Sequence, residues 1–529
     1  MAEGASHTSL VETLAQPSFY PHRPQSVEVR QTHISWVFLA GSFVYKLKKP
    51  VRFRFLDYSS RERRLESCLA EVRLNRRLAP AVYLGVVAVR RHDDGFAIGS
   101  IDELGGEAED YLVAMRRLPE EEMLDRRLAQ GTAGAADLER VAAKLVAFHA
   151  SCQDRGETYG SREVIGETVL GNLAECAAVA GDAVSGSRIR ELRRYLEKFL
   201  DEHEELLRRR VSEGRIRDGH GDLRAEHICL NAALDIFDCV EFSERLRSTD
   251  VASEIAFLAM DLDFLGFPAL AEGFARAYGE ACGDRELHDL LEFYRCHRAL
   301  VRGKVEILRS QEPEVGAAAR EEAREAARRY FRLAARYARG RRPAELVVVC
   351  GLSGTGKSTV AQVVGDLSGF AVLGSDLTRK RLARVPRFLR LDPESARALY
   401  GADSTRRTYA ALFAGARESL AAGRGAVLDA TFLNPADRRE ALILARAMNV
   451  PVTFLECQAR EEEVLRRLRD RQKRPDEVSD ATEEIYLRQR AEATPITVPA
   501  PARHRIIDTA RDREQIAADV EQELGLGVG

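Results

Sequence analysis

The sequence lacks the features that would place the protein in a membrane or crosslink it. No apolar run approaches the roughly 18 residues that a membrane-spanning helix needs. The first residues carry neither the basic end nor the apolar stretch of a signal peptide. The nine cysteines stand singly, without a Cys-x-x-Cys pair, which disfavours a disulfide framework and a zinc site. We therefore expect a reduced, cytoplasmic protein that does not enter a membrane.

Net charge is nearly absent as well. The 529 residues carry 80 Lys and Arg against 83 Asp and Glu, a formal net charge of -3. This balance disfavours a protein built mainly to hold nucleic acid, although it leaves room for local basic patches. Hydrophobic residues make up 45% and charged residues 31%, which is enough apolar material for a sizeable core. At roughly 100–200 residues per domain, the length predicts about two to four domains.

The clearest domain boundary lies near residue 340. Residues 321–338 (EEAREAARRYFRLAARYA) predict a long helix, because Ala, Arg and Glu favour helices. The Gly and Pro of GRRPAE then interrupt the helix, and LVVVC at 346–350 is typical of a short buried strand. We place a linker at 339–344, between an N-terminal domain of residues 1–338 and a C-terminal domain of residues 345–529.

The N-terminal domain changes character along its length. Strand-like stretches lie near 35–48, at 82–90 and at 111–118, with a helical stretch at 62–78 between them. From about residue 120 the pattern is mostly helical, and Leu138, Val141, Leu145 and Phe148 fall on one helix face. We therefore expect a small lobe at about 25–118 and a large, helical lobe at about 119–338.

The strongest motif is GLSGTGKST at 351–359, which satisfies the Walker A pattern G-x-x-x-x-G-K-[ST]. Its glycines let backbone N–H groups curl around phosphate oxygens, and Lys357 would meet the β- and γ-phosphates of a nucleotide. The Ser358 hydroxyl could ligate Mg²⁺. An apolar strand precedes the loop, and a helix whose N-terminus faces the anion follows it. The residues that we expect to hold the nucleotide are Gly351, Ser353, Gly354, Thr355, Gly356, Lys357, Ser358 and Thr359.

Further strands and charged residues follow this loop. Residues 370–382 predict a second strand that runs into a turn and a helix, with Asp376 and Arg379 as Asp-x-x-Arg. The apolar strand AVLDATF contains Asp429, a candidate carboxylate for the Mg²⁺ shell. Strands at 450–457 and 504–510 complete a set of about five. Between these last two lies a basic segment whose arginines could close over the phosphates and stabilise the charge in transfer: Arg466, Arg467, Arg469, Arg471 and Arg474.

Over about 344–525 the sequence resembles the small P-loop kinases of the gluconate-kinase, shikimate-kinase and polynucleotide-kinase kind. The resemblance implies that Asp376 is the base facing the acceptor hydroxyl and that Arg379 holds the substrate. It also implies an arginine lid within 466–474, of which we take Arg469 as the catalytic member beside Lys357. The residues by themselves leave simpler alternatives open: Asp376 as a helix cap, Asp429 as a structural strand end, and each lid arginine on a solvated helix face.

A second constellation lies in the N-terminal domain. HGDLRAEHICL at 220–230 is followed seven residues later by FDCVEF at 237–242. A His-x-Asp turn between short apolar strands, with another Asp after it, is the way in which protein-kinase-like phosphotransferases place two carboxylates around one phosphate. The first carboxylate orients or deprotonates a hydroxyl, and the second holds Mg²⁺.

Over most of 30–310 the sequence resembles the aminoglycoside phosphotransferase and choline kinase group. The resemblance implies that Asp222 is the base and that Asp238 is a metal ligand. It matches Lys46 to the strand lysine that meets the α- and β-phosphates, Glu71 to its ion-pair partner and Met115 to the hinge beside adenine. It also matches His149 to a helical histidine of the group and makes Asp250 a structural support of the catalytic turn.

The chain departs from the pattern of this group at three places. His227 stands where a second Mg²⁺ ligand is usually Asn, and imidazole nitrogen suits softer metals than Mg²⁺. Arg224 replaces a common histidine, and only AGS at 40–42 stands where a glycine-rich loop would precede Lys46. An active phosphotransferase and a degenerate ATP-binding module therefore both stay open. From the residues alone, Lys46 could also belong to a solvated basic stretch, Glu71 to a surface pair and His149 to the core.

We expect α/β and α+β architecture: an N-terminal bilobal protein-kinase-like fold and a C-terminal P-loop NTPase with about five parallel strands. The pair resembles bacterial AAA family ATPases that join these same two modules. The function that we predict is ATP- and Mg²⁺-dependent phosphate transfer by the C-terminal domain to a hydroxyl of a small molecule. The alternatives are an ATP-hydrolysing regulator with a kinase-like sensor domain, and a nucleic-acid 5′-end kinase or repair factor, which the acidic balance does not favour.

Overall fold

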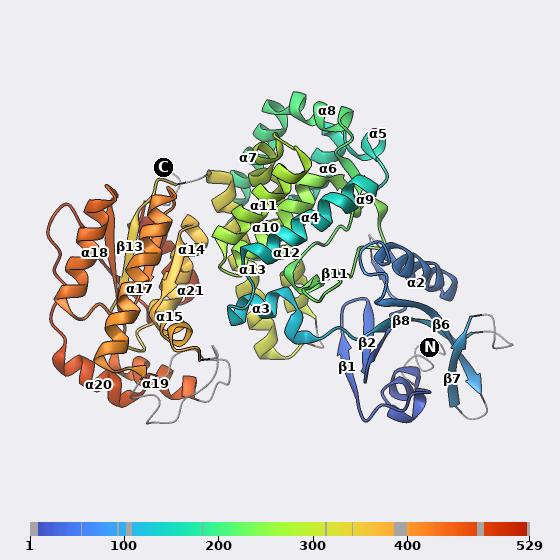
Figure 1. The fold of residues 1–529 in the computed structure, drawn as a ribbon, viewed down its shortest axis with the longest axis horizontal. Coiled ribbons are helices and arrows are strands. Elements are labelled where there is room, and N and C mark those ends of the chain that lie inside the picture. The colour runs from blue at the N-terminus through green and yellow to red at the C-terminus, as the bar shows by residue number, and fades with distance from the viewer. Residues whose placement is uncertain are drawn as a thin grey trace.

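The computed structural model describes residues 9–53, 56–92, 95–101, 108–181, 183–312, 315–340, 342–385, 399–472 and 481–525. The N-terminal and C-terminal domains lie side by side (Figure 1). The helical large lobe of the N-terminal domain lies next to the C-terminal domain, and the small lobe lies on the far side of the large lobe. Among the described residues, no helix is long and apolar enough to span a membrane.

The small lobe is a six-stranded antiparallel sheet in the order β1-β2-β3-β8-β6-β7. The helix α2 (Arg61–Asn75) packs against β6 and β8, and the Ser60 side chain caps its first turn by accepting a hydrogen bond from the Arg63 N–H. Apolar side chains fill both faces of the sheet, as its alternating strands require. The strands are β1 (Val27–Gln31), β2 (Ser35–Ala40), β3 (Phe43–Lys48), β6 (Tyr83–His92), β7 (Gly95–Ser100) and β8 (Asp110–Arg116).

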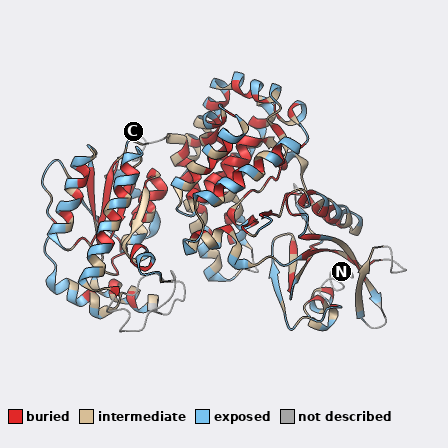
Figure 2. Cartoon of the chain, in the orientation of Figure 1, coloured by how far each residue is buried: buried red, intermediate tan, exposed pale blue. Residues whose placement is uncertain are grey.

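The large lobe is mostly helical, and one large apolar cluster joins its helices. The helix α10 (Val251–Phe264) runs through its centre and is buried along nearly its whole length (Figure 2). Two short ribbons, β9 (Ile216–Asp218) with β12 (Ser248–Asp250) and β10 (Ile228–Cys229) with β11 (Asp235–Ile236), carry the turn that contains Asp222. The other helices are α3 (Leu124–Gln130), α4 (Ala135–Ser151), α5 (Gly156–Tyr159), α6 (Arg162–Val179), α7 (Gly186–Glu202), α8 (Glu204–Ser212), α9 (Glu244–Arg247), α11 (Pro268–Cys282), α12 (Leu287–Gln311) and α13 (Ala317–Arg339).

The C-terminal domain is a parallel sheet of five strands in the order β14-β15-β13-β16-β17, which confirms the expected architecture. The strands are β13 (Leu346–Cys350), β14 (Ala371–Gly374), β15 (Ala426–Asp429), β16 (Val452–Gln458) and β17 (Arg503–Asp508). Helices cover both faces and bury a separate apolar cluster on each. The described helices of this domain are α14 (Lys357–Ser368), α15 (Ser375–Leu382), α17 (Ala402–Ala421), α18 (Pro435–Ala447), α19 (Glu461–Gln472), α20 (Glu483–Glu492) and α21 (Arg513–Glu523). Because all five strands run the same way, their carboxyl ends meet at one edge, where ligands bind in folds of this kind.

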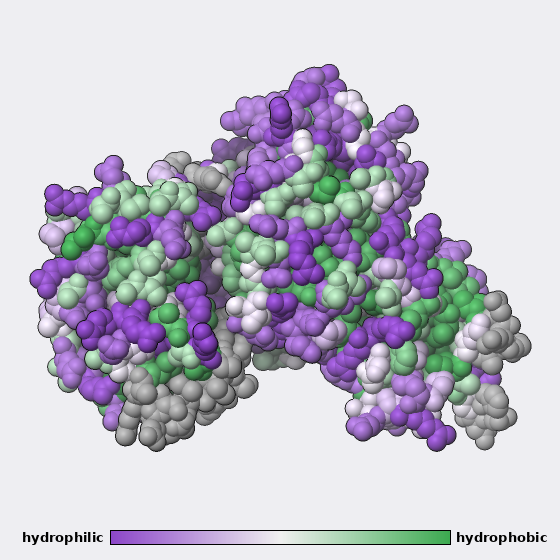
Figure 3. All heavy atoms as spheres, in the orientation of Figure 1, coloured by the Kyte–Doolittle hydropathy of each residue, from purple (hydrophilic) through white to green (hydrophobic). Residues whose placement is uncertain are grey.

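The chain leaves α13 at Arg339 and enters β13 at Leu346, at the place where the sequence predicts a linker. The predicted helix at 321–338 is confirmed as part of α13. On the face drawn in Figure 3, hydrophobic side chains gather over the small lobe beside α2 and β6, where Leu69 and Leu84 are exposed. Hydrophilic side chains cover the outer helices of the large lobe, as expected of a chain with 31% charged residues.

Candidate functional sites

The P-loop connects β13 to α14 and depends on its glycines. Gly351, Gly354 and Gly356 have φ angles of 127°, 81° and 84°, which side chains rarely allow. A Cβ on Gly351 would lie 2.6 Å from the Cys457 carbonyl oxygen on the neighbouring strand. The loop therefore takes a path that only glycine permits at these positions, with the N-terminus of α14 directly after it.

Side chains from other elements hold this loop in place. The Thr509 hydroxyl donates to the Thr355 carbonyl at 2.6 Å, and the Lys357 ammonium donates to the Leu352 carbonyl at 2.8 Å. The Ser353 N–H donates to Gln489 Oε1 on α20 at 2.9 Å. Burial lowers the pKa of Lys357. The lysine thus lies folded back within the loop, where it can turn toward a phosphate.

Two carboxylates lie at the same edge of the sheet. Asp429 ends β15; its burial raises its pKa, while Lys357 and the Ser358 hydroxyl lower it. Asp376 follows β14, whose last residue pairs with Asp429, and it interacts electrostatically with both Lys357 and Asp429. Sequence-distant residues from three loops are therefore brought together around the P-loop.

Ser358 and Asp429 fit a magnesium ion, because both offer hard oxygen ligands and the Ser358 hydroxyl interacts with the Asp429 carboxylate. Within the described ranges, no group of three or more His, Cys, Asp and Glu side chains is arranged to hold a metal without help from a nucleotide. A Mg²⁺ ion at this position would share the phosphates of a bound nucleotide, as is usual for this ion.

Arg379 lies beside Asp376. Its Nη1 donates to Asp376 Oδ1 at 2.9 Å, and its guanidinium lies 4.5 Å from the centre of the Tyr400 ring. The side chain is 7% exposed, yet its Nε has no hydrogen-bond partner among the described residues. Arg379 thus orients the Asp376 carboxylate and keeps one donor free.

The structure separates the arginines of the basic segment from one another. Arg469 Nε lies 2.8 Å from Glu483, and the side chain is 62% exposed. The expectation that Arg469 is the catalytic member stays a prediction. Arg471 interacts electrostatically with Lys357 and Asp429. The other members point elsewhere or are not described: Arg466 pairs with Glu463, Arg467 donates to the Thr509 carbonyl, and Arg474 lies outside the described residues.

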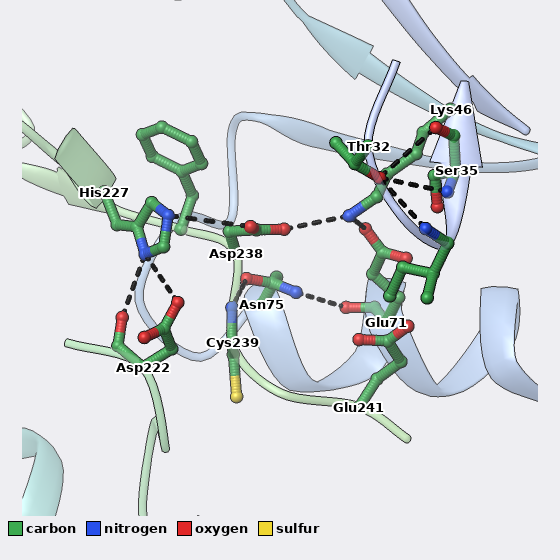
Figure 4. A network of polar contacts seen from close by, with 12 residues as sticks. Thr32, Ser35, Lys46, Glu71, Asn75, Asp222, His227, Asp238, Cys239 and Glu241 are labelled. Atoms are coloured by element: carbon green, nitrogen blue, oxygen red, sulfur yellow. Dashed lines mark hydrogen bonds and ion pairs between the residues drawn. The ribbon is translucent and has the colours of Figure 1, made fainter. Parts of the chain in front are cut away.

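The N-terminal site is built around Lys46 of β3 (Figure 4). Its ammonium donates to Glu71 on α2 at 2.9 Å and to Asp238 at 2.8 Å. Burial would lower the pKa of Lys46, but these two carboxylates raise it well above the ordinary value. The side chains of Lys46 and Glu71 are 13% and 1% exposed, so neither a solvated basic stretch nor a surface pair describes them.

Asp238 has a φ of 62°, a left-handed conformation that is uncommon for aspartate. The next backbone N–H, of Cys239, donates to Asn75 Oδ1 on α2 at 2.8 Å, which helps to hold this conformation. Burial would raise the pKa of Asp238, but Lys46 and His227 lower it well below its ordinary value. Strained backbone of this kind concentrates at functional sites.

The Asp222 turn carries a second cluster of charge. Arg224 donates to both carboxylate oxygens of Asp222, with its Nε 3.1 and 3.3 Å away. His227 Nδ1 lies 2.9 Å from the Asp222 carbonyl oxygen, and its Nε2 lies 3.6 Å from Asp238 Oδ2. Burial would raise the pKa of Asp222, but Arg224, His227 and Arg302 lower it well below its ordinary value. His227 therefore stands between the two carboxylates (Figure 4).

Glu254, a residue that sequence reasoning missed, holds this turn. Glu254 of α10 accepts hydrogen bonds from the N–H groups of His220 and Gly221, each at 2.5 Å, and from His149 Nε2 at 2.7 Å. His149 is thus a buried brace of the turn. Asp250, expected to support the turn, pairs with Arg210 at 2.7 Å and lies in β12, which pairs with β9 ahead of the turn. An acidic residue in the apolar stretch of α10 was the available signal, because a buried carboxylate needs partners.

Other contributions to the N-terminal site were also missed. Lys48 is fully buried beside Lys46 and donates to Glu71 at 2.7 Å; it also pairs with Glu241.

Met115 is 8% exposed in β8, where it pairs with Val44. It lies just before an open depression lined by the Gly41–Ser42 turn and residues 117–121. The expected contact between Met115 and adenine stays a prediction.

Comparison with known proteins finds a separate match in each half of the chain. Residues 39–293 match a phosphotransferase enzyme family, and residues 346–496 match an AAA domain. Over 436 residues the chain is 33% identical to "Uncharacterized protein Rv2004c" of Mycobacterium tuberculosis and to "Uncharacterized protein Mb2027c" of Mycobacterium bovis, covering 82% of this chain and 84% of each relative. The chain belongs to the family of these mycobacterial proteins. This member joins a phosphotransferase domain to a P-loop kinase-like domain and is an ATP-dependent enzyme of the kinase and phosphotransferase kind.

Solved structures resemble the two domains of this family member separately. A sugar kinase from Janibacter sp. is 21% identical, covers 35% of this chain and 96% of its own, and has a TM-score of 0.26. A choline/ethanolamine kinase family protein from Mesorhizobium loti is 12% identical, covers 61% of this chain and 94% of its own, and has a TM-score of 0.36.

Proposed function

We propose that the C-terminal domain transfers the γ-phosphate of ATP to a hydroxyl group of a small molecule. The observation that carries this proposal is the position of Asp376. It lies beside Lys357 and Asp429 at the carboxyl edge of the sheet, where a phosphate on the P-loop would meet an acceptor. A carboxylate at this position is suited to take the proton of the attacking hydroxyl.

The residues around the P-loop then have separate tasks. The loop amides and Lys357 bind the phosphates, and Ser358 with Asp429 would hold Mg²⁺, which offsets phosphate charge when bound. As the hydroxyl oxygen of the acceptor bonds to the γ-phosphorus, Asp376 accepts the proton of that hydroxyl. The bond from that phosphorus to the bridging oxygen breaks, and ADP leaves with this oxygen. Arg379 orients Asp376, and Arg471 is the arginine placed to offset negative charge.

The N-terminal domain binds a second nucleotide in this proposal. Lys46, held by Glu71, would meet its phosphates, Met115 would lie beside adenine, and Asp238 with His227 would hold a metal ion. Asp222 is the candidate base. Its pairing with Arg224 favours a second interpretation of this domain, as a ligand-binding sensor that regulates ATP hydrolysis by the C-terminal domain. Arg224 contacts both carboxylate oxygens of Asp222 and lowers its pKa, whereas Arg379 donates to one oxygen of Asp376, so Asp222 is the poorer proton acceptor of the two.

Measuring ATP turnover with and without a panel of sugars, other hydroxyl metabolites and oligonucleotide 5′ ends separates these functions. Phosphate that appears on a small molecule supports the proposal. Phosphate on an oligonucleotide end supports a nucleic-acid kinase, and hydrolysis that no acceptor changes supports the regulator. In Asp222→Ala, turnover should persist when the C-terminal domain does the chemistry; its loss in a folded protein would assign the chemistry to the N-terminal domain.

A further inference from the structure

The two domains meet along α13, the last helix of the N-terminal domain. This helix packs against α12 and α7 on one side and against the P-loop helix α14 on the other (Figure 1). Arginines of the N-terminal domain face acidic residues of the C-terminal domain across this junction. The pairs are Arg328 and Arg332 with Glu514, Arg329 with Asp366, and Arg188 and Arg339 with Glu521.

Arg329 is distinguished from these arginines by what it holds. Its Nε donates to Asp366 Oδ2 at 3.1 Å, in the last turn of α14. Its Nη2 donates to the Phe264 carbonyl at 2.6 Å, at the end of α10, and its guanidinium lies 4.1 Å from the centre of the Phe264 ring. One guanidinium therefore ties the last turn of α14 to the last turn of α10.

Each of these helices also carries an element of a candidate nucleotide site. α14 begins at Lys357 of the P-loop, so Asp366 and the loop are parts of one rigid rod about 18 Å long. α10 carries Glu254, which braces the Asp222 turn, and Asp261, which accepts the Ala225 N–H of the same turn at 2.9 Å.

Asp366 needs the contact with Arg329. Its side chain is 2% exposed, and it stands near the negative end of the α14 dipole, where a carboxylate is unfavourable without a cation. The Gln362 amide donates to the other carboxylate oxygen at 2.9 Å but brings no charge. A second cation, Arg332, reaches the same oxygen as Arg329 only at 3.9 Å, so Arg329 at 3.1 Å makes the closer contact. Removing Arg329 would leave a buried carboxylate short of its nearest cation, so the end of α14 would have to shift.

We propose that Arg329 is a positioning residue for the P-loop, supplied by the neighbouring domain, and that through α10 and α14 it couples the Asp222 turn to ATP binding at residues 351–359. This inference rests on the proposed binding of ATP at the P-loop. In this inference the N-terminal domain contributes to ATP binding at the P-loop without itself catalysing a reaction.

The test measures ATP·Mg²⁺ affinity of the full chain by calorimetry, with Lys357→Ala defining the residual binding that does not use the P-loop. Arg329→Ala should weaken P-loop binding about tenfold, because the loss of one charge-assisted contact displaces the rod that carries the loop. Asp366→Asn should weaken it similarly. The double variant should be no worse than either single variant, since both changes break the same contact.

Arg324→Ala is the matched control. Arg324 lies on the same helix, is half-exposed and contacts Glu321 within that helix at 3.2 Å. It should bind ATP as the wild type does. Arg329→Lys should recover part of the affinity, because one ammonium can meet Asp366 but does not provide the fork that also reaches the Phe264 carbonyl.

Hydrogen exchange supplies a measurement that would not change if Arg329 only stabilised the fold. In the wild type, ATP binding should slow exchange at 219–227 as well as in α14. Any slowing at 219–227 that remains in Lys357→Ala does not depend on the P-loop. Arg329→Ala should reduce the response at 219–227 to that remaining level. If Arg329→Ala does not fold, Arg329→Lys and Asp366→Asn carry the same test. Unchanged ATP affinity in variants that merely melt earlier would overturn the inference. A wild type that binds no ATP at the P-loop would instead overturn the proposed function.

Discussion

Replacing Glu254 by glutamine tests how strongly the Asp222 turn is held. The carboxylate of Glu254 accepts three hydrogen bonds, from the N–H groups of His220 and Gly221 and from His149. Glutamine keeps its size and one acceptor oxygen. His149 can change tautomer to accept from the new amide, with its other nitrogen then donating to the Tyr278 hydroxyl 2.7 Å away. The change therefore removes mainly the negative charge.

Two estimates of the loss in the free energy of unfolding for Glu254→Gln agree. Burial would raise the pKa of Glu254, but His149, His220 and the turn amides lower it from 4.5 to about 2. A shift of that size corresponds to about 3 kcal/mol of stability at neutral pH. Separately, each of the two backbone bonds loses about 1–1.5 kcal/mol when its acceptor becomes neutral. The expected loss in the free energy of unfolding is therefore about 2–3 kcal/mol.

The effect should depend on pH in a defined direction. Because the pKa of Glu254 is lowered on folding, its contribution is complete above about pH 4.5 and is lost as the pH falls toward about 2. Urea unfolding of the wild type and Glu254→Gln at pH 7 should differ by about 2–3 kcal/mol, and the difference should shrink as the pH is lowered from 4.5.

Glu280→Gln is the control, since Glu280 is exposed on α11 and only pairs with Arg276 at 3.5 Å. It should change the unfolding free energy by less than about 0.5 kcal/mol. A loss under about 1 kcal/mol for Glu254→Gln, or a loss that does not vary with pH, would refute the reasoning that this charge holds the turn.

Three further outcomes follow from the two sites. Gly354→Ala should weaken ATP binding and cost about 1–2 kcal/mol in thermal unfolding, because its φ is 81° and the new Cβ would lie 2.8 Å from Val464; an unchanged titration would contradict this. Lys357→Ala should remove most ATP turnover in a steady-state assay, and an unchanged rate would sink the P-loop assignment. Arg224→Ala should raise the pKa of Asp222 toward its ordinary value in a carboxyl NMR titration, since the guanidinium is the first of the charges that lower it; an unmoved midpoint would show that the clamp is unimportant.

Local patterns predicted much of the fold and of the P-loop site. The strand before GLSGTGKST and the helix after it are visible as a short apolar run and a helical period, and the loop forms between β13 and α14. Asp376 and Asp429 could be anticipated because carboxyl ends of parallel strands meet at one edge, although their approach to Lys357 depends on the strand order. The strand, the P-loop and the helix after it could be predicted because they are built from residues that are adjacent in the sequence.

What sequence could not predict depends on side chains that meet across large separations. Arg469 and Arg471 are two residues apart on one helix, and only the direction of that helix decides which approaches Lys357. Lys48 looked like part of a basic stretch, yet it is buried because Glu241, far along the chain, pairs with it. Such contacts leave no periodic trace in the sequence.

The central claim is that the C-terminal domain moves the γ-phosphate of ATP onto a hydroxyl with Asp376 as base. The most direct test follows the label of γ-labelled ATP in reactions of the wild type, Asp376→Asn and Asp222→Ala with the acceptor panel. We predict label on a small-molecule acceptor with the wild type and with Asp222→Ala, and at least a hundredfold slower transfer with Asp376→Asn, the usual size of a general-base contribution. Transfer that survives in Asp376→Asn, or that disappears only in Asp222→Ala, would contradict the account.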